Sequence, residues 1–290
     1  LDEMRRNQNT VSFATNLALA KKVFAHTAQY DGAIANYLSS LDDTQDHQKR
    51  HPYPQTLHLS FERVQEMRYG ENPHQTAAFY TELNPPADSL ANATILHGKE
   101  LSYNNLLDID SALSLLREFG RPASVILKHN NPCGAAVSKH LVDTFRGAYD
   151  GDPLSAYGGI VGFNREVDEA TALAMAEPGR FLECVVAPSF SPEAFEILTN
   201  KPTWKKSVRL LSTGPMIARK PTMEMRKVDG GLLVQDKDAS NENLSSARSV
   251  TKKKLTPLEL DDLKFAWVVC KHVKSNAIVI VKDGKLLGTG

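Results

Sequence analysis

The sequence predicts an α/β fold in which two similar units follow a separate helical segment. The clearest strand signal is the run ASVIL at residues 123–127, which is too short for a helix and rich in β-branched residues. An order of helix, turn and strand over residues 106–137 recurs over residues 260–290, and both strands end at a lysine. The apolar content of 41% and the charged content of 23% are ordinary for a globular protein.

Charge and cysteine usage argue against several classes of protein. Thirty-four basic residues balance thirty-four acidic ones, so generic binding of nucleic acid or of an anionic membrane is not expected. Cys133, Cys184 and Cys270 are far apart and outside any CxxC motif, which argues against a disulfide framework and a zinc site. Reduced thiols favour the cytoplasm. No apolar run approaches ~18 residues, and the first residues lack the hydrophobic core of a signal peptide.

The first part of the chain predicts helices followed by a domain boundary. Residues 11–38 carry apolar side chains at helical spacing, and Asp31 and Gly32 are expected to break or cap the helix. Residues 39–56 are polar, charged and proline-bearing, so we interpret them as a linker. The chain lacks an initiator methionine and stops where a strand is turning, so both ends are expected to be cut.

A strand at residues 57–64 is expected to lead into a polar loop at residues 67–75. In this loop, Arg68 is a fork-shaped cation suited to a phosphate, and Tyr69 offers a flat ring and a hydroxyl. His74 is a second candidate for acid–base chemistry. The alternative is that Arg68 makes a surface ion pair and His74 caps a turn. We favour that alternative for either residue alone, but not for the whole loop.

A strand and a turn within residues 92–105 precede a helix at residues 106–119. Asn104 and Asn105 lie at the expected start of this helix, where asparagine serves first of all as an N-cap. A cap and a ligand contact are compatible, because helix N-termini also attract anions.

The stretch KHNNPCG, residues 128–134, places a lysine and a histidine at the end of a buried strand. In α/β sheets, ligands bind beyond the carboxyl ends of strands, so Lys128 could supply a cation and His129 a titratable base. The Asn–Pro step and Gly134 are expected to shape a turn whose backbone can approach a ligand. A solvated polar turn without function explains this stretch, taken alone, equally well.

The next part predicts a helix at residues 141–149 and a glycine-containing segment at residues 150–161, in which Tyr157 could stack on a flat ring. This segment matches neither a P-loop nor a GxGxxG fingerprint. Residues 181–188 predict another strand, with the acid Glu183 embedded in it. Residues 201–209 and 252–254 are interpreted as solvated basic faces.

Six motifs lie along nearly the whole chain. They are RYGENPHQ (68–75), LSYNNLLDIDSA (101–112), LKHNNPCGAA (127–136), DPLSAYGGIV (152–161), DGGLLVQD (229–236) and VKSNAIVIVKDG (273–284). In sequence and in order they resemble the PurH family of bifunctional purine-biosynthesis proteins. That family joins 5-aminoimidazole-4-carboxamide ribonucleotide (AICAR) formyltransferase to IMP cyclohydrolase.

The resemblance implies a domain plan. Residues 1–38, which include FAHTAQYDGAIANYL, would be the C-terminal helices of the cyclohydrolase domain, and residues 39–56 would be the linker. Residues 57–250 would form the first of two cytidine-deaminase-like transformylase units, with insertions, and residues 251–290 would start a second, incomplete unit. The resemblance also implies a homodimer with the active site shared between chains. The co-substrate would be 10-formyltetrahydrofolate, and a structural potassium ion is a further expectation.

The resemblance assigns eight site residues by their positions in these motifs and strands. They are the catalytic pair Lys128 and His129, an asparagine near the formyl transfer (Asn276), three ribonucleotide contacts (Arg68, Tyr69 and Asn105), an aromatic residue near the substrate ring (Tyr157) and the acid Glu183. Relatives can carry aspartate at the position of Glu183, so its role is less secure. The cyclohydrolase catalytic residues and a later GAGQxSR segment fall outside this sequence. The segment alone is therefore expected to be inactive.

Formyl transfer requires a base and oxyanion donors. The amine of AICAR is a poor nucleophile because its lone pair is delocalised, and its attack on the formyl group passes through a tetrahedral oxyanion. His129 suits removal of the amine proton, Lys128 and Asn276 suit the oxyanion, and Arg68 suits the 5′-phosphate. The product would be FAICAR, which the full-length protein would cyclise to IMP.

Two other functions stay open at this point. One is a catalytically inactive fragment that binds a purine ribonucleotide. The other is a zinc deaminase of the same fold, although the lack of HxE and PCxxC motifs argues against it.

Overall fold

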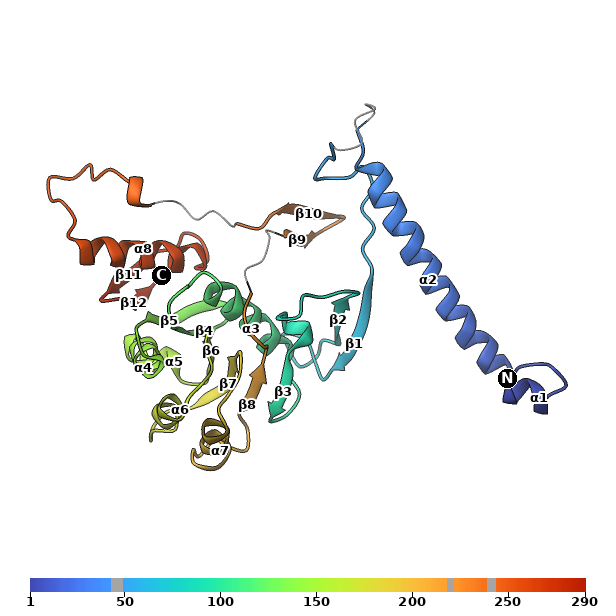
Figure 1. The fold of residues 1–290 in the computed structure, drawn as a ribbon, viewed down its shortest axis with the longest axis horizontal. Coiled ribbons are helices and arrows are strands. Elements are labelled where there is room, and N and C mark those ends of the chain that lie inside the picture. The colour runs from blue at the N-terminus through green and yellow to red at the C-terminus, as the bar shows by residue number, and fades with distance from the viewer. Residues whose placement is uncertain (43–48, 218–221, 239–243) are drawn as a thin grey trace. The chain divides into compact units, whose positions relative to one another are not determined.

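The computed structural model describes residues 1–42, 49–217, 222–238 and 244–290, and Figure 1 labels its elements. The chain divides into two compact units. The first comprises Leu1–Val64 and Tyr80–Asn84, and the second comprises Gln65–Phe79 and Pro85–Gly290. Helices and a large mixed sheet make up the second unit, so the predicted α/β class is confirmed.

The first unit is dominated by one long helix. A short helix, α1 (Asp2–Arg6), precedes α2 (Phe13–Ser39). The predicted break at Asp31 and Gly32 is wrong, because α2 continues through both residues. Gly32 serves a close approach instead, since a Cβ there would lie 3.2 Å from the Cβ of His58 in the returning chain.

The returning chain is fixed to the last turns of α2. The Asn36 side chain donates to the carbonyl oxygen of His58 at 2.7 Å and accepts from the amide of His58 at 2.8 Å. The amide of Gln55 also reaches the carbonyl oxygen of Ser39 at 3.2 Å. Residues 49–56 of the predicted linker therefore belong to the same compact unit as α2. Residues 43–48 lie outside the described part of the chain.

A separate two-stranded sheet consists of β1 (Phe61–Met67) and β2 (Ala77–Glu82). β1 begins later than the strand predicted at residues 57–64. The loop that joins β1 to β2 belongs to the second unit and contains the polar stretch that the sequence singled out.

An eight-stranded mixed sheet forms the centre of the second unit, with the strand order β11-β12-β5-β4-β6-β7-β8-β3. Its strands are β3 (Thr94–His97), β4 (Ala123–Lys128), β5 (Asn131–Val137), β6 (Gly159–Phe163), β7 (Leu182–Ala187), β8 (Arg209–Ser212), β11 (Val279–Lys282) and β12 (Lys285–Thr289). The neighbours β6, β7 and β8 are parallel, and the other neighbouring pairs are antiparallel. β4 confirms the strand predicted at residues 123–127, all of which are buried between β5 and β6.

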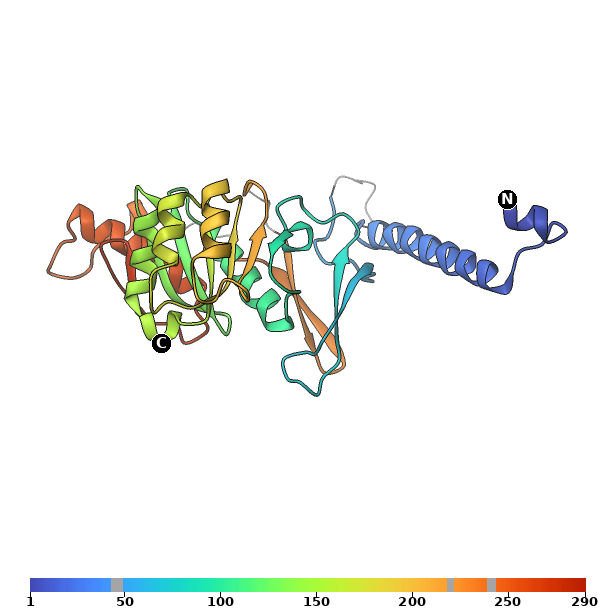
Figure 2. The same cartoon turned by 90° about the horizontal axis from the view of Figure 1, so that it is seen from below.

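Helices cover both faces of this sheet, as Figures 1 and 2 show. α3 (Tyr103–Leu116) and α8 (Pro257–Lys271) share one core, which Val125 of β4 enters. α4 (Leu141–Gly151), α6 (Glu169–Met175) and α7 (Pro192–Asn200) share the other core, which the next residue of β4, Ile126, enters. The alternation follows from the two-residue repeat of a strand, and it makes β4 a central strand that is covered on both sides.

The remaining elements are small. They are α5 (Pro153–Ala156), the 3-10 helices η1 (Leu90–Asn92) and η2 (Leu244–Ser246), and a separate hairpin of β9 (Met223–Val228) and β10 (Gly231–Asp236). Over the ranges that the structure describes, no helix is long and apolar enough to cross a lipid bilayer.

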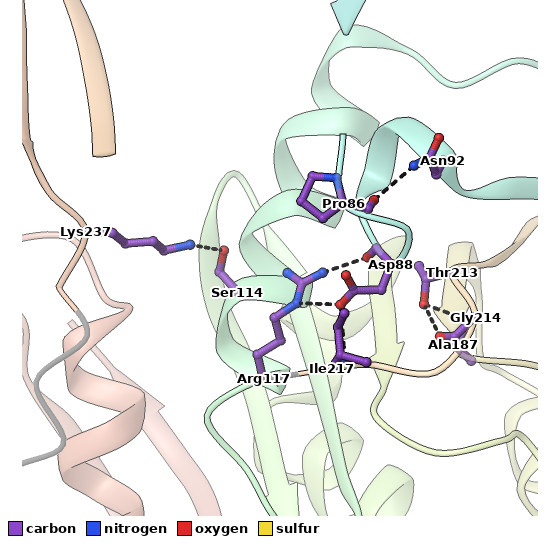
Figure 3. Close-up of polar contacts among 10 residues, drawn as sticks. All are labelled: Pro86, Asp88, Asn92, Ser114, Arg117, Ala187, Thr213, Gly214, Ile217 and Lys237. Carbon is purple, nitrogen blue, oxygen red and sulfur yellow. Dashed lines mark hydrogen bonds and ion pairs between the residues drawn. The ribbon is translucent and has the colours of Figure 1, made fainter. Parts of the chain in front are cut away.

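The C-terminal half of α3 is held by a buried ion pair (Figure 3). Arg117, directly after α3, approaches the carboxylate of Asp88 at 3.4 Å, and the Asp88 side chain is only 2% exposed. The same carboxylate accepts the amide of Ile217 at 3.3 Å. On the neighbouring turn of α3, Ser114 accepts a hydrogen bond from Nζ of Lys237 at 3.1 Å. These contacts fix the helix whose other end carries site residues.

Two stretches of the second unit repeat one local design. Ser102 caps α3 and Thr256 caps α8, each in a capping box that is completed by the side chain three residues later, Asn105 or Glu259. Each helix leads to a hairpin, β4–β5 or β11–β12, whose two turn residues have positive φ. Equivalent positions lie 154 residues apart (256 − 102 and 259 − 105). The structure therefore shows the recurrence of helix, turn and strand that the sequence predicts.

The two repeats meet within one sheet. β5 and β12 are equivalent strands, and they pair with each other in antiparallel fashion. In the order β11-β12-β5-β4, the second hairpin strand of each repeat therefore lies at the junction, and the first strand, β4 or β11, lies next to it. Within residues 251–290, β11 and β12 thus belong to the same sheet as the strands of the first repeat.

A charged cluster joins the C-terminal ends of α3 and α8. Glu118 accepts a hydrogen bond from Nζ of Lys271 at 2.7 Å and lies 3.3 Å from Nε2 of His272. Burial acts to raise the pKa of Glu118, but the hydrogen bonds from His272 and Lys271 outweigh it and hold the pKa below its ordinary value. Such a carboxyl group stabilises the fold above its unfolded-state pKa, and this contribution is lost as the pH falls through its folded-state pKa.

We expect the free energy of unfolding of Glu118→Gln to fall less steeply at acid pH than that of the wild type. Urea unfolding measured between about pH 7 and about pH 3, around the ordinary pKa of glutamate, should show a smaller loss of stability for the variant than for the wild type. Glu177→Gln is the matched control, because Glu177 forms its ion pairs at the surface, where its side chain is 43% exposed. Equal acid slopes for the wild type and Glu118→Gln would contradict the assignment.

Candidate active site

The polar stretch after β4 is a tight hairpin turn. Lys128 of β4 pairs with Asn131 of β5, and His129 and Asn130 form the connection between them. We call residues 128–131 the His129 turn. His129 and Asn130 have φ values of 55° and 61°, as a type I′ turn requires at both central positions. Asparagine and histidine are among the residues that adopt positive φ most often, so both residue types fit the turn.

The His129 turn is held from two sides. On the side of α3, Oδ1 of Asp108 accepts the backbone amide of Asn130 at 2.5 Å, and the hydroxyl of Ser111 donates to the Asn130 side chain at 3.2 Å. From the segment after α8, Nζ of Lys274 donates to the carbonyl oxygen of His129 at 3.3 Å. His129 itself is exposed. The backbone of the turn is therefore fixed while the histidine stays open to a ligand.

Lys128 faces the segment that precedes β6. Its Nζ donates to the carbonyl oxygen of Tyr157 at 3.0 Å, which uses one of three N–H groups. Tyr157 is 53% exposed, and its ring centroid lies 5.3 Å from that of Phe181. The structure thus brings Lys128, His129 and Tyr157 to the same edge of the sheet.

The expected N-cap role of Asn104 and Asn105 is wrong. α3 begins at Tyr103 and its N-cap is Ser102, so the helix starts earlier than the predicted residue 106. Asn105 is the third helical residue, and its Oδ1 accepts the backbone amide of Ser102 at 3.1 Å, which closes the capping box. The N-cap signal was present in the sequence, but it was a serine three residues before the asparagine.

Asn105 also reaches across the sheet edge to Glu183. Its Nδ2 donates to Oε1 of Glu183 at 2.9 Å, and Arg209 approaches the same oxygen at 3.5 Å. Asn105 is buried, whereas the side chain of Glu183 is 40% exposed. The amide and the guanidinium thus orient a carboxylate that solvent or a ligand can reach.

Arg68 and Tyr69 lie on the loop between β1 and β2. The guanidinium of Arg68 lies 4.8 Å from the ring centroid of Tyr69 and donates to the Tyr69 hydroxyl at 3.1 Å. The loop is tied to the start of α3, because Nδ2 of Asn104 lies 3.5 Å from the carbonyl oxygen of Glu71. Arg68 is exposed and stacked on an aromatic ring, which leaves the outer edge of its guanidinium available to an anion.

Asn276 lies on the segment between α8 and β11. It is exposed, and its Oδ1 accepts a hydrogen bond from the hydroxyl of Ser275 at 3.1 Å. Two residues earlier, the amide of Lys274 donates to Oδ1 of Asn131 at 3.1 Å, so the segment adjoins the His129 turn. Among the described contacts, none joins Asn276 directly to His129.

The edge that gathers these residues differs from the expected one. Tyr157, Glu183 and Arg209 lie at the amino ends of β6, β7 and β8, not at their carboxyl ends. They meet the carboxyl end of β4 because β4 runs antiparallel to β6. Among these residues, only Lys128 and His129 therefore lie at the carboxyl end of a strand, where ligands of α/β sheets usually bind.

The expected turn-shaping role of Gly134 is also wrong. Gly134 lies within β5, paired with Ile126, and a Cβ there would come to 2.1 Å from the carbonyl oxygen of Ala148 in α4. Glycine at this position lets α4 pack against the strand. At the neighbouring position, burial raises the pKa of Cys133 to about 11, and the charge of Asp152 acts in the same direction, so the thiol stays protonated near neutral pH.

A cavity of about 540 Å³ lies at the second hairpin and not at the His129 turn. Its lining includes Asp262 of α8 with Asp283 and Gly284 of the β11–β12 turn. These three residues are the counterparts, 154 positions later, of Asp108, His129 and Asn130. We place the candidate site at the His129 turn, because that turn carries the lysine–histidine pair, whereas the turn at the cavity carries an aspartate in place of the histidine.

Sequence reasoning missed three residues of the site. Asp108 lies three positions after Asn105, hence on the same side of α3, which is a spacing that the sequence already contained. Lys274 lies two positions before Asn276. Arg209 was assigned to a solvated basic face, but its side chain is only 17% exposed and pairs with Glu183. In the described ranges, no three His, Cys, Asp or Glu side chains are arranged to hold a metal ion.

Comparison with known families identifies the chain. A model of the AICARFT/IMPCHase bienzyme family matches residues 1–290. The chain belongs to the AICARFT/IMPCHase bienzyme family. The family joins AICAR formyltransferase and IMP cyclohydrolase activities of purine biosynthesis, and its formyltransferases use a folate-derived co-substrate. The resemblance carried by the six sequence motifs is thereby confirmed.

Proposed function

We propose that the protein to which this chain belongs transfers a formyl group from 10-formyltetrahydrofolate to the 5-amino group of AICAR. The product is FAICAR, which the same protein cyclises to IMP in de novo purine biosynthesis. The observation that carries the formyl-transfer proposal is the His129 turn, in which an exposed histidine sits on a tethered backbone beside Lys128. The cyclisation step rests on family membership, and no residue of this chain is assigned to it.

In the proposed mechanism, His129 removes the proton from the attacking amine. Imidazole is the side chain whose ordinary pKa lies nearest to neutral pH, which is why histidine is the usual base for such a step. Lys128 and Asn276 stabilise the tetrahedral oxyanion. When this intermediate collapses, the bond between the formyl carbon and N10 of the folate breaks, and tetrahydrofolate leaves after N10 takes up the proton held by His129. The Nζ of Lys128 has two N–H groups left after its contact with the Tyr157 carbonyl, so it can hold its place and still donate.

The remaining site residues bind the ribonucleotide in this proposal. Arg68 pairs with the 5′-phosphate through the outer edge of its guanidinium, while the ring of Tyr69 packs against the face of the same guanidinium. The Tyr157 ring, already packed beside Phe181, offers its exposed part to the flat substrate base. Asn105, for which the resemblance implies a direct ribonucleotide contact, is buried and is instead proposed to orient Glu183, whose carboxylate accepts hydrogen bonds from the substrate.

The domain plan and the assembly are part of the same proposal. Residues 1–38 belong to the cyclohydrolase domain, residues 39–56 link it onward, and residues 57–250 and 251–290 contribute to two cytidine-deaminase-like transformylase units. The repeat built around α3 and α8 supports the two-unit plan. The structural potassium ion stays a prediction.

We expect a homodimer whose active site is shared between chains. Sedimentation of the complete protein at micromolar concentration should give a dimer. A strict monomer that still turns over AICAR would show that one chain suffices for the site.

The competing function is a ribonucleotide-binding protein without catalysis. The complete protein should convert AICAR to FAICAR only when 10-formyltetrahydrofolate is present, which can be followed by product separation and mass. AICAR titration without folate measures binding alone. Tight AICAR binding with no product in the presence of folate would reject the proposed formyl transfer and favour a ribonucleotide-binding protein.

A further inference from the structure

Two aspartates perform the same task in the two repeats. In the first repeat, Oδ1 of Asp108 accepts the amide of Asn130 at 2.5 Å. In the second, the carboxylate of Asp262 accepts the amides of Asp283 and Gly284 at 2.9 Å and 2.7 Å. In each repeat, an aspartate on the helix therefore grips the backbone of the hairpin turn. The equivalent bonds span the same 22 positions (130 − 108 and 284 − 262).

The second repeat has the same turn geometry and the same tether, although its turn contains no histidine. Its turn residues, Asp283 and Gly284, have φ values of 52° and 67°, close to those of the His129 turn. The aspartate tether thus accompanies this turn geometry whether or not the turn carries a histidine. A carboxylate that accepts a backbone N–H forms a charge-assisted hydrogen bond, which is roughly twice as strong as a neutral one.

The first repeat adds a contact that bears on the histidine. The peptide group between His129 and Asn130 is held at both ends, its carbonyl oxygen by Nζ of Lys274 at 3.3 Å and its amide by Asp108 at 2.5 Å. The orientation of this peptide plane sets ψ of His129. Because the Cα–Cβ bond direction follows from the backbone, the two contacts together fix the direction in which the His129 side chain leaves the turn.

We propose that Asp108 is a positioning residue that aims His129 for proton removal by holding the amide of Asn130. The proposal rests on the proposed formyl transfer. Asp108 is only 8% exposed, and it contacts the turn through the amide of Asn130. It therefore acts on the histidine through the backbone. A misplacement of about 1 Å in a reacting group costs on the order of 10²-fold in rate, which is the scale that loss of the tether should approach.

The test compares the two aspartates in the complete protein. Asp108→Ala should lower kcat for formyl transfer by about 10- to 100-fold, with KM for AICAR within about threefold of the wild type. Asp108→Asn keeps a weaker, neutral acceptor oxygen, so its kcat should fall between those of Asp108→Ala and the wild type, about tenfold down. Asp262→Ala and Asp262→Asn remove or weaken the same tether at the turn without a histidine. They should cost comparable stability in urea and leave kcat within about threefold.

The outcomes separate the two proposals. A wild-type protein without formyl transfer would overturn the proposed function before any variant is made. An active wild type, with Asp108 variants whose kcat matches that of the Asp262 variants, would overturn the positioning role. If Asp108→Ala does not fold, Asp108→Asn decides the question. A kcat of Asp108→Asn within threefold of the wild type would show that Asp108 does not position His129. A KM increase without a kcat decrease would also reject the positioning role.

Discussion

Replacing His129 should lower kcat for formyl transfer by about 10² to 10⁴, the usual cost of losing a positioned base. His129→Asn is the variant of choice, because asparagine adopts the positive φ of 55° that this position requires and so preserves the turn. AICAR affinity should change little, since the proposed phosphate contact at Arg68 lies on a different loop. Steady-state kinetics and an AICAR titration without folate measure the two effects separately.

Arg68→Ala is the contrasting variant. It removes the proposed phosphate partner and leaves the base in place, so the affinity for AICAR should fall while kcat at saturating AICAR stays within a few-fold of the wild type. If His129→Asn instead kept kcat within a few-fold, the base would have to be another group. His74, on the same loop as Arg68, would then be the first alternative to replace.

Adding one methyl group at Gly134 should destabilise the protein by about 3 kcal/mol or more, at the upper end of what overpacking costs. The Cβ of an alanine would lie 2.1 Å from the carbonyl oxygen and 2.9 Å from the carbonyl carbon of Ala148, both backbone atoms of α4. Neither atom can swing away as a flexible side chain would, so β5 and α4 must separate. Urea unfolding of Gly134→Ala measures the loss as a lower midpoint.

Gly120→Ala is the matched control for this effect. A Cβ at Gly120 meets nothing within 4 Å, so the substitution should change stability by no more than about 0.5 kcal/mol, as is usual at open surface positions. A Gly134→Ala protein as stable as Gly120→Ala would mean that α4 does not pack against β5 as closely as the structure has it.

The sequence predicts the central strand and the recurring helix–turn–strand order well, because both depend on local patterns. Residues 123–127 form a short run that is apolar except for Ser124, and its length and β-branched residues are typical of a buried strand. The eight site residues came from motif resemblance, and the structure brings Lys128, His129 and Tyr157 together at one edge while it pairs Asn105 with Glu183.

Other features could not be predicted because they depend on contacts between distant segments. Gly32 reads as a helix breaker, yet it is retained inside α2 because residue 58 passes close to it. The capping role went to Ser102 and not to the asparagines, because a residue's place in a cap depends on where the helix begins. The tether from Asp108 joins positions 22 residues apart, and no local pattern in the sequence indicates it.

The seam between β5 and β12 has the form of a contact between two identical subunits. In such an isologous contact the same patch lies on both sides of a two-fold axis, and every substitution in a homodimer appears twice. Here both patches belong to a single polypeptide, because β5 and β12 are equivalent strands of one chain. The two repeats can therefore carry different residues at equivalent positions of their hairpin turns. The first turn carries a histidine where the second carries an aspartate, while the capping box, the aspartate tether and the hairpin are repeated around both.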